Sequence, residues 1–214
     1  MNVFRIIKFY IITIYYLKFS QILWRIYYLI KPKFSVKIKN VEILKIKKLK
    51  NKFIIKSNSI KGKNSFLFLN ELREIKTDKA IDQIHLNKLW LYNLNYFDFL
   101  NSNLTIDQKK ITLIFLKRWL KEVKSINYVG LDPYPTSLRI VNWIKWHLSG
   151  NLVFDEMKSS IVTQTEYLSK NIEWHLLGNH LLANAKALIF SGVVFDGLLS
   201  KQWKSKGIEI YKKQ

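Results

Sequence analysis

An asparagine and a histidine stand side by side at positions 179 and 180, inside a largely apolar stretch that runs from Ile172 to Leu188. A neutral amide can stabilise the negative charge that develops when a proton is removed next to a carboxylate. An imidazole titrates near neutral pH and can accept that proton. The pair also fits a structural role, in which Asn179 caps a helix after Gly178 and His180 is packed.

Four other residues are candidates for substrate binding: Tyr134, Arg139, Trp143 and Glu173. A guanidinium matches a carboxylate with two parallel hydrogen bonds, so Arg139 could hold an acidic substrate or could instead bridge to Glu173 between helices. Tyr134 and Trp143 could offer a surface on which sugar rings stack, although burial in the core explains Trp143 equally well. Glu173 is expected to stand behind the residues that touch the substrate.

Metal and cofactor chemistry is not indicated by the sequence. His175 and His180 are five residues apart, which on a helix separates their directions by about 140°. They would make a poor pair of metal ligands, and the sequence contains no other cluster of ligand residues. We expect neither a metal nor a cofactor.

The elements that must position these residues are mostly helices. Residues 2–30 are predicted to form one helix that ends at Lys31-Pro32. Residues 33–70 are predicted to contain a few short strands, and residues 89–100 an aromatic-rich connector. The strands are expected at Phe34–Ile38, Lys52–Lys56 and Ser65–Leu69.

From residue 106 onward the apolar residues repeat with a helical period. A first helix, capped by Thr105 or Asp107, is expected to bury Ile111, Ile114, Phe115, Trp119 and Val123. Asp132–Pro135 is predicted to be a rigid turn. Further helices are predicted from Thr136 or Ser137 to His147, from about Phe154 to Glu173, from Asn179 to Phe195 and from Gly197 to Tyr211. Short connections between them favour antiparallel helix hairpins stacked side by side.

The charge of the chain is strongly positive and concentrated near its N-terminus. The net charge is +21, and residues 1–63 contain sixteen basic residues and a single acid, Glu42. A polyanionic partner would explain this excess: nucleic acid, an acidic polysaccharide or an anionic membrane surface. A compositional bias towards lysine would also explain it. We do not expect nucleic-acid binding, because no such motif is present and the basic residues alternate with Ile and Leu.

The N-terminal apolar stretch Phe9–Leu17 has basic residues before it but no small-residue cleavage site after it. Lys18 and Arg25 interrupt the run of about 20 apolar residues that a membrane span requires. We therefore expect a helix that lies on a membrane or packs on the domain. The chain has no cysteine, which excludes disulfides and thiolate sites. A cytoplasmic or membrane-peripheral location is favoured over a secreted one.

The motifs resemble those of the heparinase II/III family of polysaccharide lyases. The resemblance is carried by Asn-Leu-Asn-Tyr-Phe-Asp at 93–98, Pro-Tyr-Pro-Thr-Ser-Leu-Arg-Ile-Val-Asn-Trp at 133–143 and Glu-Trp-His-Leu-Leu-Gly-Asn-His-Leu-Leu-Ala-Asn at 173–184. It extends from about residue 10, where Leu17, Gln21 and Arg25 also match, to the C-terminus. It implies a fold of the α/α-toroid type and β-elimination of a uronic-acid-containing polysaccharide similar to heparin or alginate. It makes Asn179 the carboxylate neutraliser and His180 the base or its catalytic partner.

The resemblance divides the chain into a basic helix-and-strand region, 1–70, and the first part of a helical toroid, 71–214. Family members continue into a β-sandwich, which we expect to be absent here. They also use a tyrosine as general acid and a further histidine, whereas only Tyr211 follows His180 in this chain. We therefore expect a fragment that is inactive alone. The alternatives are a protein that binds acidic glycans without cleaving them, a membrane-peripheral protein of surface-polysaccharide metabolism and, less favoured, a nucleic-acid-binding protein.

Overall fold

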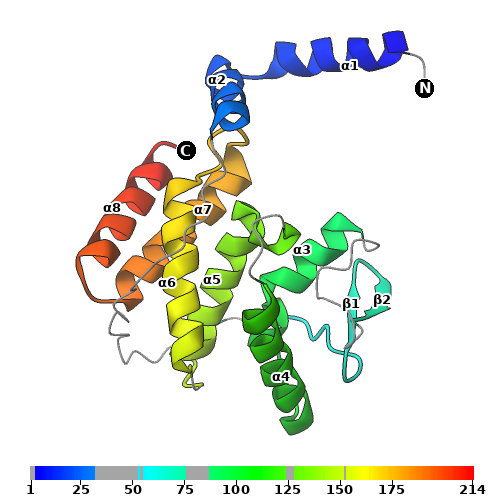
Figure 1. Cartoon of the computed structure of the whole chain (residues 1–214), viewed down its shortest axis with the longest axis vertical. Coiled ribbons are helices and arrows are strands. Elements are labelled where there is room, and N and C mark those ends of the chain that lie inside the picture. Colours follow the sequence, from blue (N-terminus) through cyan, green and yellow to red (C-terminus); the bar gives the residue numbers. More distant parts are fainter. Residues whose placement is uncertain (1–2, 32–52, 54, 76–86, 124–127, 152) are drawn as a thin grey trace.

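The computed structural model describes residues 3–31, 53, 55–75, 87–123, 128–151 and 153–214. Within these residues the fold is mainly helical, as predicted, with eight α-helices and a single two-stranded sheet. Helices α5 to α8 pack together in the body of the molecule, and α1 extends away from it (Figure 1). The predicted strand Phe34–Ile38 lies outside the described residues, and Lys52–Lys56 is described only in part.

The N-terminal region forms two helices, α1 (Val3–Tyr16) and α2 (Phe19–Ile30), so the prediction of one continuous helix is wrong. The chain breaks at Lys18, whose backbone is extended with φ −65° and ψ 143°. The side chain of Gln21 accepts a hydrogen bond from Lys18 N at 3.0 Å, which satisfies an amide at the start of α2. Neither glycine nor proline marks this break, so it is not predictable from residue types alone.

Most of α1 faces solvent on every side. Among the residues from Phe4 to Tyr16 only Ile6 is partly buried. No single helix in the described part of the chain is long and apolar enough to cross a membrane. Helices α1 and α2 meet that condition of length and composition only as a pair, and the pair is bent by 118°.

The sheet is an antiparallel hairpin of β1 (Ser65–Phe68) and β2 (Glu71–Glu74), which confirms the strand predicted near residue 65. Leu69 and Asn70 form its turn with φ values of 54° and 61°. Two central residues with positive φ are typical of the tight turns that match the twist of a hairpin. Phe66 and Phe68 of β1 are buried in the core that the helices share.

Residues 89–100, predicted to be a connector, form most of helix α3 (Lys88–Tyr96) and of the 3-10 helix η1 (Asp98–Asn101). Asn87 caps α3 by accepting a hydrogen bond from Leu89 N at 2.8 Å. Phe97 joins the two helices in a left-handed conformation with φ 56°, and its side chain is fully buried.

Helix α4 (Ile106–Glu122) begins as predicted at Thr105, whose hydroxyl accepts from Gln108 N at 3.2 Å. Phe115 and Trp119 face the core, whereas Ile114 is 64% exposed and does not belong to the buried face. The prediction for Ile114 is wrong because this residue only precedes the buried Phe115. Neighbouring residues of a helix point about 100° apart around its axis.

The remaining helices are α5 (Pro133–Leu148), α6 (Asp155–Lys170), α7 (Gly178–Val194) and α8 (Leu198–Lys212), and the short 3-10 helix η2 (Val129–Leu131) precedes α5. The predicted turn at Asp132–Pro135 is instead the first turn of α5, because proline fits the start of a helix, where its missing N–H is not needed. Helix α5 is central and contacts α3, α6 and α7.

Candidate functional site

His180 lies in the first turn of α7, between a carboxylate and an aromatic ring. Its Nδ1 is 3.1 Å from Oε1 of Glu173, which precedes the helix. The ring of Tyr134, from the first turn of α5, lies 4.4 Å from the His180 ring between centroids. The structure therefore brings together three of the residues that the sequence singled out.

Glu173 is buried and firmly held. Its side chain is 8% exposed, compared with 36% for that of His180. Asn184, one turn further along α7, donates to Glu173 Oε2 at 3.2 Å and accepts from Glu173 N at 2.9 Å. Burial raises the pKa of Glu173, and the neighbouring His180 and Asn184 oppose that rise.

The Glu173 carboxylate lies beside Nδ1 of His180, although the contact does not have the geometry of a hydrogen bond. A carboxylate beside Nδ1 favours the tautomer that carries the proton on Nδ1. Nε2 then keeps its lone pair and can accept a proton from a substrate. A base oriented by a buried acid is the arrangement found in many hydrogen-bonded catalytic groups.

Asn179 is exposed beside His180, as the second residue of α7. It is not the helix cap, because the cap position belongs to Leu177. The amide nitrogen of Gly178 donates to the side chain of Gln214 at 3.1 Å. The N-terminus of a helix favours negative charge, so a carboxylate near Asn179 would meet both an amide side chain and the positive end of α7.

The backbone that leads into α7 is strained. Leu177 has φ 59° and ψ −167°, a region that is essentially reserved for glycine, and Gly178 follows with φ 50°. Such a residue costs about 1–3 kcal/mol. The strain lies within three residues of His180 and sets the direction in which α7 begins.

A cavity of about 340 Å³ adjoins Glu173. Its lining includes Tyr92, Asp132, Tyr167 and His175, and the hydroxyl of Tyr92 donates to Asp132. Burial, together with Asp132, raises the pKa of Tyr92, and burial raises that of Tyr167 to about 12. These residues were not predicted as site residues, although His175 lies within the stretch from Ile172 to Leu188 that the sequence singled out.

His175 lines this cavity and has one unsatisfied polar atom. Its Nδ1 is buried and has no hydrogen-bond partner among the residues that the structure describes. Burial lowers the pKa of His175, and the neighbouring Arg25 and His180 lower it further. A buried polar atom without a partner is costly.

Arg139 and Trp143 lie in the core, and this corrects their prediction as substrate-binding residues, since both are 0% exposed. Arg139 donates to Gln164 Oε1 at 2.7 Å, to Gly130 O at 2.7 Å and to Asn95 O at 3.2 Å. Its guanidinium also lies 4.4 Å above the ring of Trp119. It therefore ties α5 to α3, η2 and α6 rather than bridging to Glu173.

Among the described residues, no group of three or more His, Asp or Glu side chains is placed to hold a metal ion. The site consequently offers acid–base and hydrogen-bonding chemistry through its protein side chains. His180, Asn179 and Glu173 are its central residues, with Tyr134 packed against the base.

Comparison of the chain with protein-family models, with curated proteins and with solved structures gives no match. The resemblance to heparinase II/III lyases therefore rests on the sequence motifs alone. The geometry of the residues within those motifs is what bears on function.

Proposed function

We propose that this chain binds an acidic polysaccharide beside the N-terminus of α7, as the helical part of a polysaccharide lyase of the heparinase II/III kind. The observation that carries the proposal is the His180 side chain, which is held by buried Glu173 at 3.1 Å and remains partly open to solvent. Asn179, the residue that the resemblance pairs with it, is exposed at the same place.

The proposed reaction is a β-elimination at a uronate unit. The carboxylate of the uronate lies against Asn179 and the start of α7, which stabilise the charge that develops on it. Nε2 of His180 takes the proton from the carbon next to the carboxylate, C5. The electron pair of that C–H bond forms the C4–C5 double bond as the C4–O bond breaks. The departing oxygen takes up a proton from water, and the products are an unsaturated uronate and a new chain end.

The α/α toroid belongs to the same proposal. Helices α5 and α6 contact each other, as do α7 and α8, and α5 also contacts α7. Helix pairs that pack in chain order with short connections are the unit from which a toroid would be built. The short connections between α7 and α8 and between α5 and α6 support this arrangement.

Proton removal and bond cleavage can be tested separately. We expect the wild-type protein, incubated with heparin and with alginate in D₂O, to exchange the uronate C5 hydrogen, followed by NMR. Cleavage would be followed by the ultraviolet absorbance of the unsaturated uronate. His180→Ala should lower the exchange rate by about 100-fold or more, the usual contribution of a general base.

Asn179→Ala should lower exchange as well, whereas Asn103→Ala, which changes another exposed asparagine, should leave it unaltered. Exchange that persists in His180→Ala would overturn the assignment of the base. Failure of the wild type to bind or exchange either polysaccharide would overturn the proposed function as a whole.

A second proposal concerns α1, which we infer to lie on an anionic membrane surface. Its large apolar side chains are exposed, including Phe4 at 81% and Tyr15 at 82%. Residues 1–31 contain Arg5, Lys8, Lys18, Arg25 and Lys31 and no acidic residue. Aromatic and aliphatic side chains enter the boundary of a bilayer, and basic residues are attracted by anionic headgroups. This property is compatible with glycan binding by the body of the molecule.

A further inference from the structure

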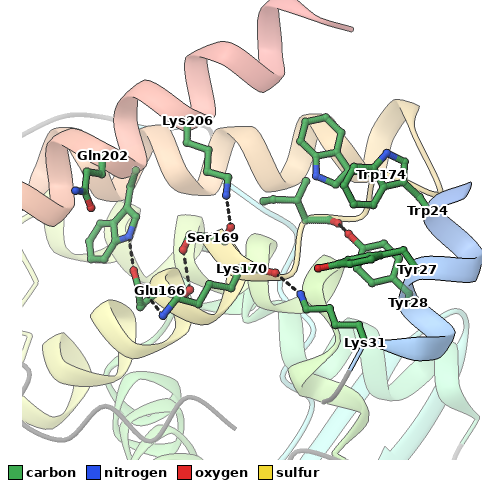
Figure 2. A pocket seen from close by; sticks show the side chains of 12 residues that line it. Trp24, Tyr27, Tyr28, Lys31, Glu166, Ser169, Lys170, Trp174, Gln202 and Lys206 are labelled. Atoms are coloured by element: carbon green, nitrogen blue, oxygen red, sulfur yellow. Dashed lines mark hydrogen bonds and ion pairs between the residues drawn. The ribbon is translucent and has the colours of Figure 1, made fainter. Parts of the chain in front are cut away.

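A second cavity, of about 400 Å³, lies between α2, α6 and α8 and beside the segment that joins α6 to α7 (Figure 2). Its volume lies within the range of small-molecule sites. No part of the proposed reaction uses it. Its walls combine aromatic rings and ammonium groups, and each kind comes from more than one element.

The aromatic wall is formed by α2 and by Trp174, which follows α6. The ring of Trp24 is stacked with that of Trp174 at 5.8 Å between centroids and with that of Tyr28 at 5.9 Å. Tyr27 adds an exposed ring next to Tyr28. A pyranose presents C–H groups on its ring face, and these pack well against flat aromatic surfaces of this kind.

The cationic wall is formed where α6 ends. Lys31 Nζ donates to Lys170 O at 2.6 Å, and Lys206 Nζ, from α8, donates to Ser169 O at 2.6 Å. Figure 2 shows both ammonium groups directed towards the last turn of α6. Cations favour this end of a helix, so these lysines also have a structural role. Each ammonium carries three donors, which leaves donors for a ligand.

The cavity has an excess of positive charge. Lys31, Lys170 and Lys206 line it together with a single carboxylate, Glu166. Glu166 is already engaged, because Lys170 Nζ lies 2.9 Å from its Oε1 and Trp203 Nε1 donates to its Oε2 at 2.9 Å. Burial lowers the pKa of Lys31, and the charge of Lys206 lowers it further. An anion between these two lysines would relieve their mutual repulsion.

We propose that this cavity binds one negatively charged pyranose unit of a glycan, with the sugar ring against Trp24 and Trp174 and its carboxylate or sulfate between Lys31 and Lys206. Tyr28 and Ile172 line this cavity and also the cavity beside Glu173, so the two are neighbours. The Tyr28 hydroxyl donates to Ile172 O at this common wall. The identity of the ligand rests on the proposed function, whereas the site itself rests on the residues that line it.

The test uses ligands that cannot undergo elimination. The indole N–H signals of Trp24 and Trp174 would be assigned by Trp→Phe substitution and followed by NMR during titration with methyl β-D-glucuronide. Methyl β-D-glucoside, which lacks the charge, is the matched control. We expect shifts of these signals with a dissociation constant of about 1–10 mM for the glucuronide and much weaker binding of the glucoside.

The double variant Lys31→Gln/Lys206→Gln should weaken glucuronide binding by about tenfold, since each lost ion pair weakens binding by a few fold. Lys201→Gln, which changes an exposed lysine of α8 outside the cavity, should bind as the wild type does. His180→Ala should also bind normally.

Three results would overturn this proposal: no shift of the two indole signals, equal binding of glucoside and glucuronide, or unchanged binding by the double variant. None of these results depends on proton exchange at C5. The proposed function would therefore stand if exchange were seen without binding in the cavity, and the cavity proposal would stand in the opposite case.

Discussion

At the scale of single residues, burial separates the roles of the three side chains around His180. Asn179 is exposed and can meet a ligand, whereas Glu173 is buried and can act only through the residues it contacts. Tyr134 is partly buried against the ring of His180. Asn184, in the next turn of α7, donates a hydrogen bond to Glu173. It lies in the motif at 173–184, although no role was predicted for it.

Glu173 makes the stability of the protein depend on pH. Its pKa is raised above the ordinary value of 4.5, so between these two values the folded state binds more protons than the unfolded state. Stability should therefore fall as pH rises through this window and stay lower above it. Glu173→Gln should abolish this pH-dependent loss of stability. In the wild type the free energy of unfolding falls by about 1.4 kcal/mol for each unit by which the pKa of Glu173 is raised. Urea unfolding of both proteins at several pH values measures the effect, and parallel pH profiles would contradict it.

Arg139 should be intolerant even of lysine. A lysine cannot reach Gln164, Gly130 and Asn95 together, so carbonyl groups would lose their donor and a charge would stay buried. We expect Arg139→Lys to lower the free energy of unfolding by about 3 kcal/mol. Arg73→Lys, in an exposed pair with Glu71, should change it by less than about 0.5 kcal/mol. Equal effects of the two substitutions on the free energy of urea unfolding would show that the buried contacts of Arg139 do not stabilise the protein.

The sequence identified the neighbourhood of the site better than the roles within it. Glu173, His180 and Tyr134 were predicted and do lie together. Arg139 and Trp143 were assigned to substrate because their chemistry suits acidic sugars, but residue type does not reveal on which face of α5 a side chain lies. Tyr92 and His175 depend on contacts between distant segments, which a single sequence does not show.

At the scale of elements, long helices with clear caps were predictable, and short ones were not. Helix α4 has a cap at Thr105 and begins where expected. Helix α3 is only nine residues long, and its buried positions are dictated by packing on β1 and α5 rather than by its own period. The prolines of α5 favour a turn when the sequence alone is considered, but at the first positions of a helix they stabilise it.

The contact between α7 and α8 depends on a glycine. A Cβ atom at Gly192 would lie 2.5 Å from Ser200 O and 2.6 Å from Lys204 N, both backbone atoms of the facing segment. Gly192→Ala should therefore destabilise the protein by about 1–2 kcal/mol, despite the better helix propensity of alanine. Gly62→Ala, whose Cβ would meet only the Ser65 side chain at 3.3 Å, is the control and should be close to neutral. Thermal unfolding of both variants decides the matter, and a Gly192→Ala protein as stable as the wild type would contradict the prediction.

At the scale of the whole molecule, α1 is exposed to solvent, whereas the hairpin and helices α3 to α8, which form the body, pack around a common core. The body buries one continuous core, which includes Phe66 from the hairpin and Trp203 from α8. Helix α1 adds almost nothing to that core (Figure 1). A positive, apolar helix held away from a folded body is an arrangement suited to a surface other than the protein itself.

We expect the protein to sediment with vesicles that contain phosphatidylserine and to bind neutral phosphatidylcholine vesicles less well. Ile11→Glu together with Ile14→Glu, at positions that are 62% and 53% exposed, should reduce vesicle binding by at least about tenfold, because each side chain contributes about 1.5–3 kcal/mol when buried in the bilayer. Leu72→Glu, at a 60% exposed position on the body, should have no effect. A wild-type protein that stays in solution with both kinds of vesicle would refute the membrane proposal.

The cavity of Figure 2 has a consequence for the order in which the protein acquires its properties. Its two central cations, Lys31 and Lys206, come from opposite ends of the chain and meet at the last turn of α6. Contacts between such distant residues form late, because the loop between them must be closed first. The cavity is therefore complete only when α8 has docked beside α6 and α2. A ligand of the cavity would bind only the folded protein and would protect it from unfolding.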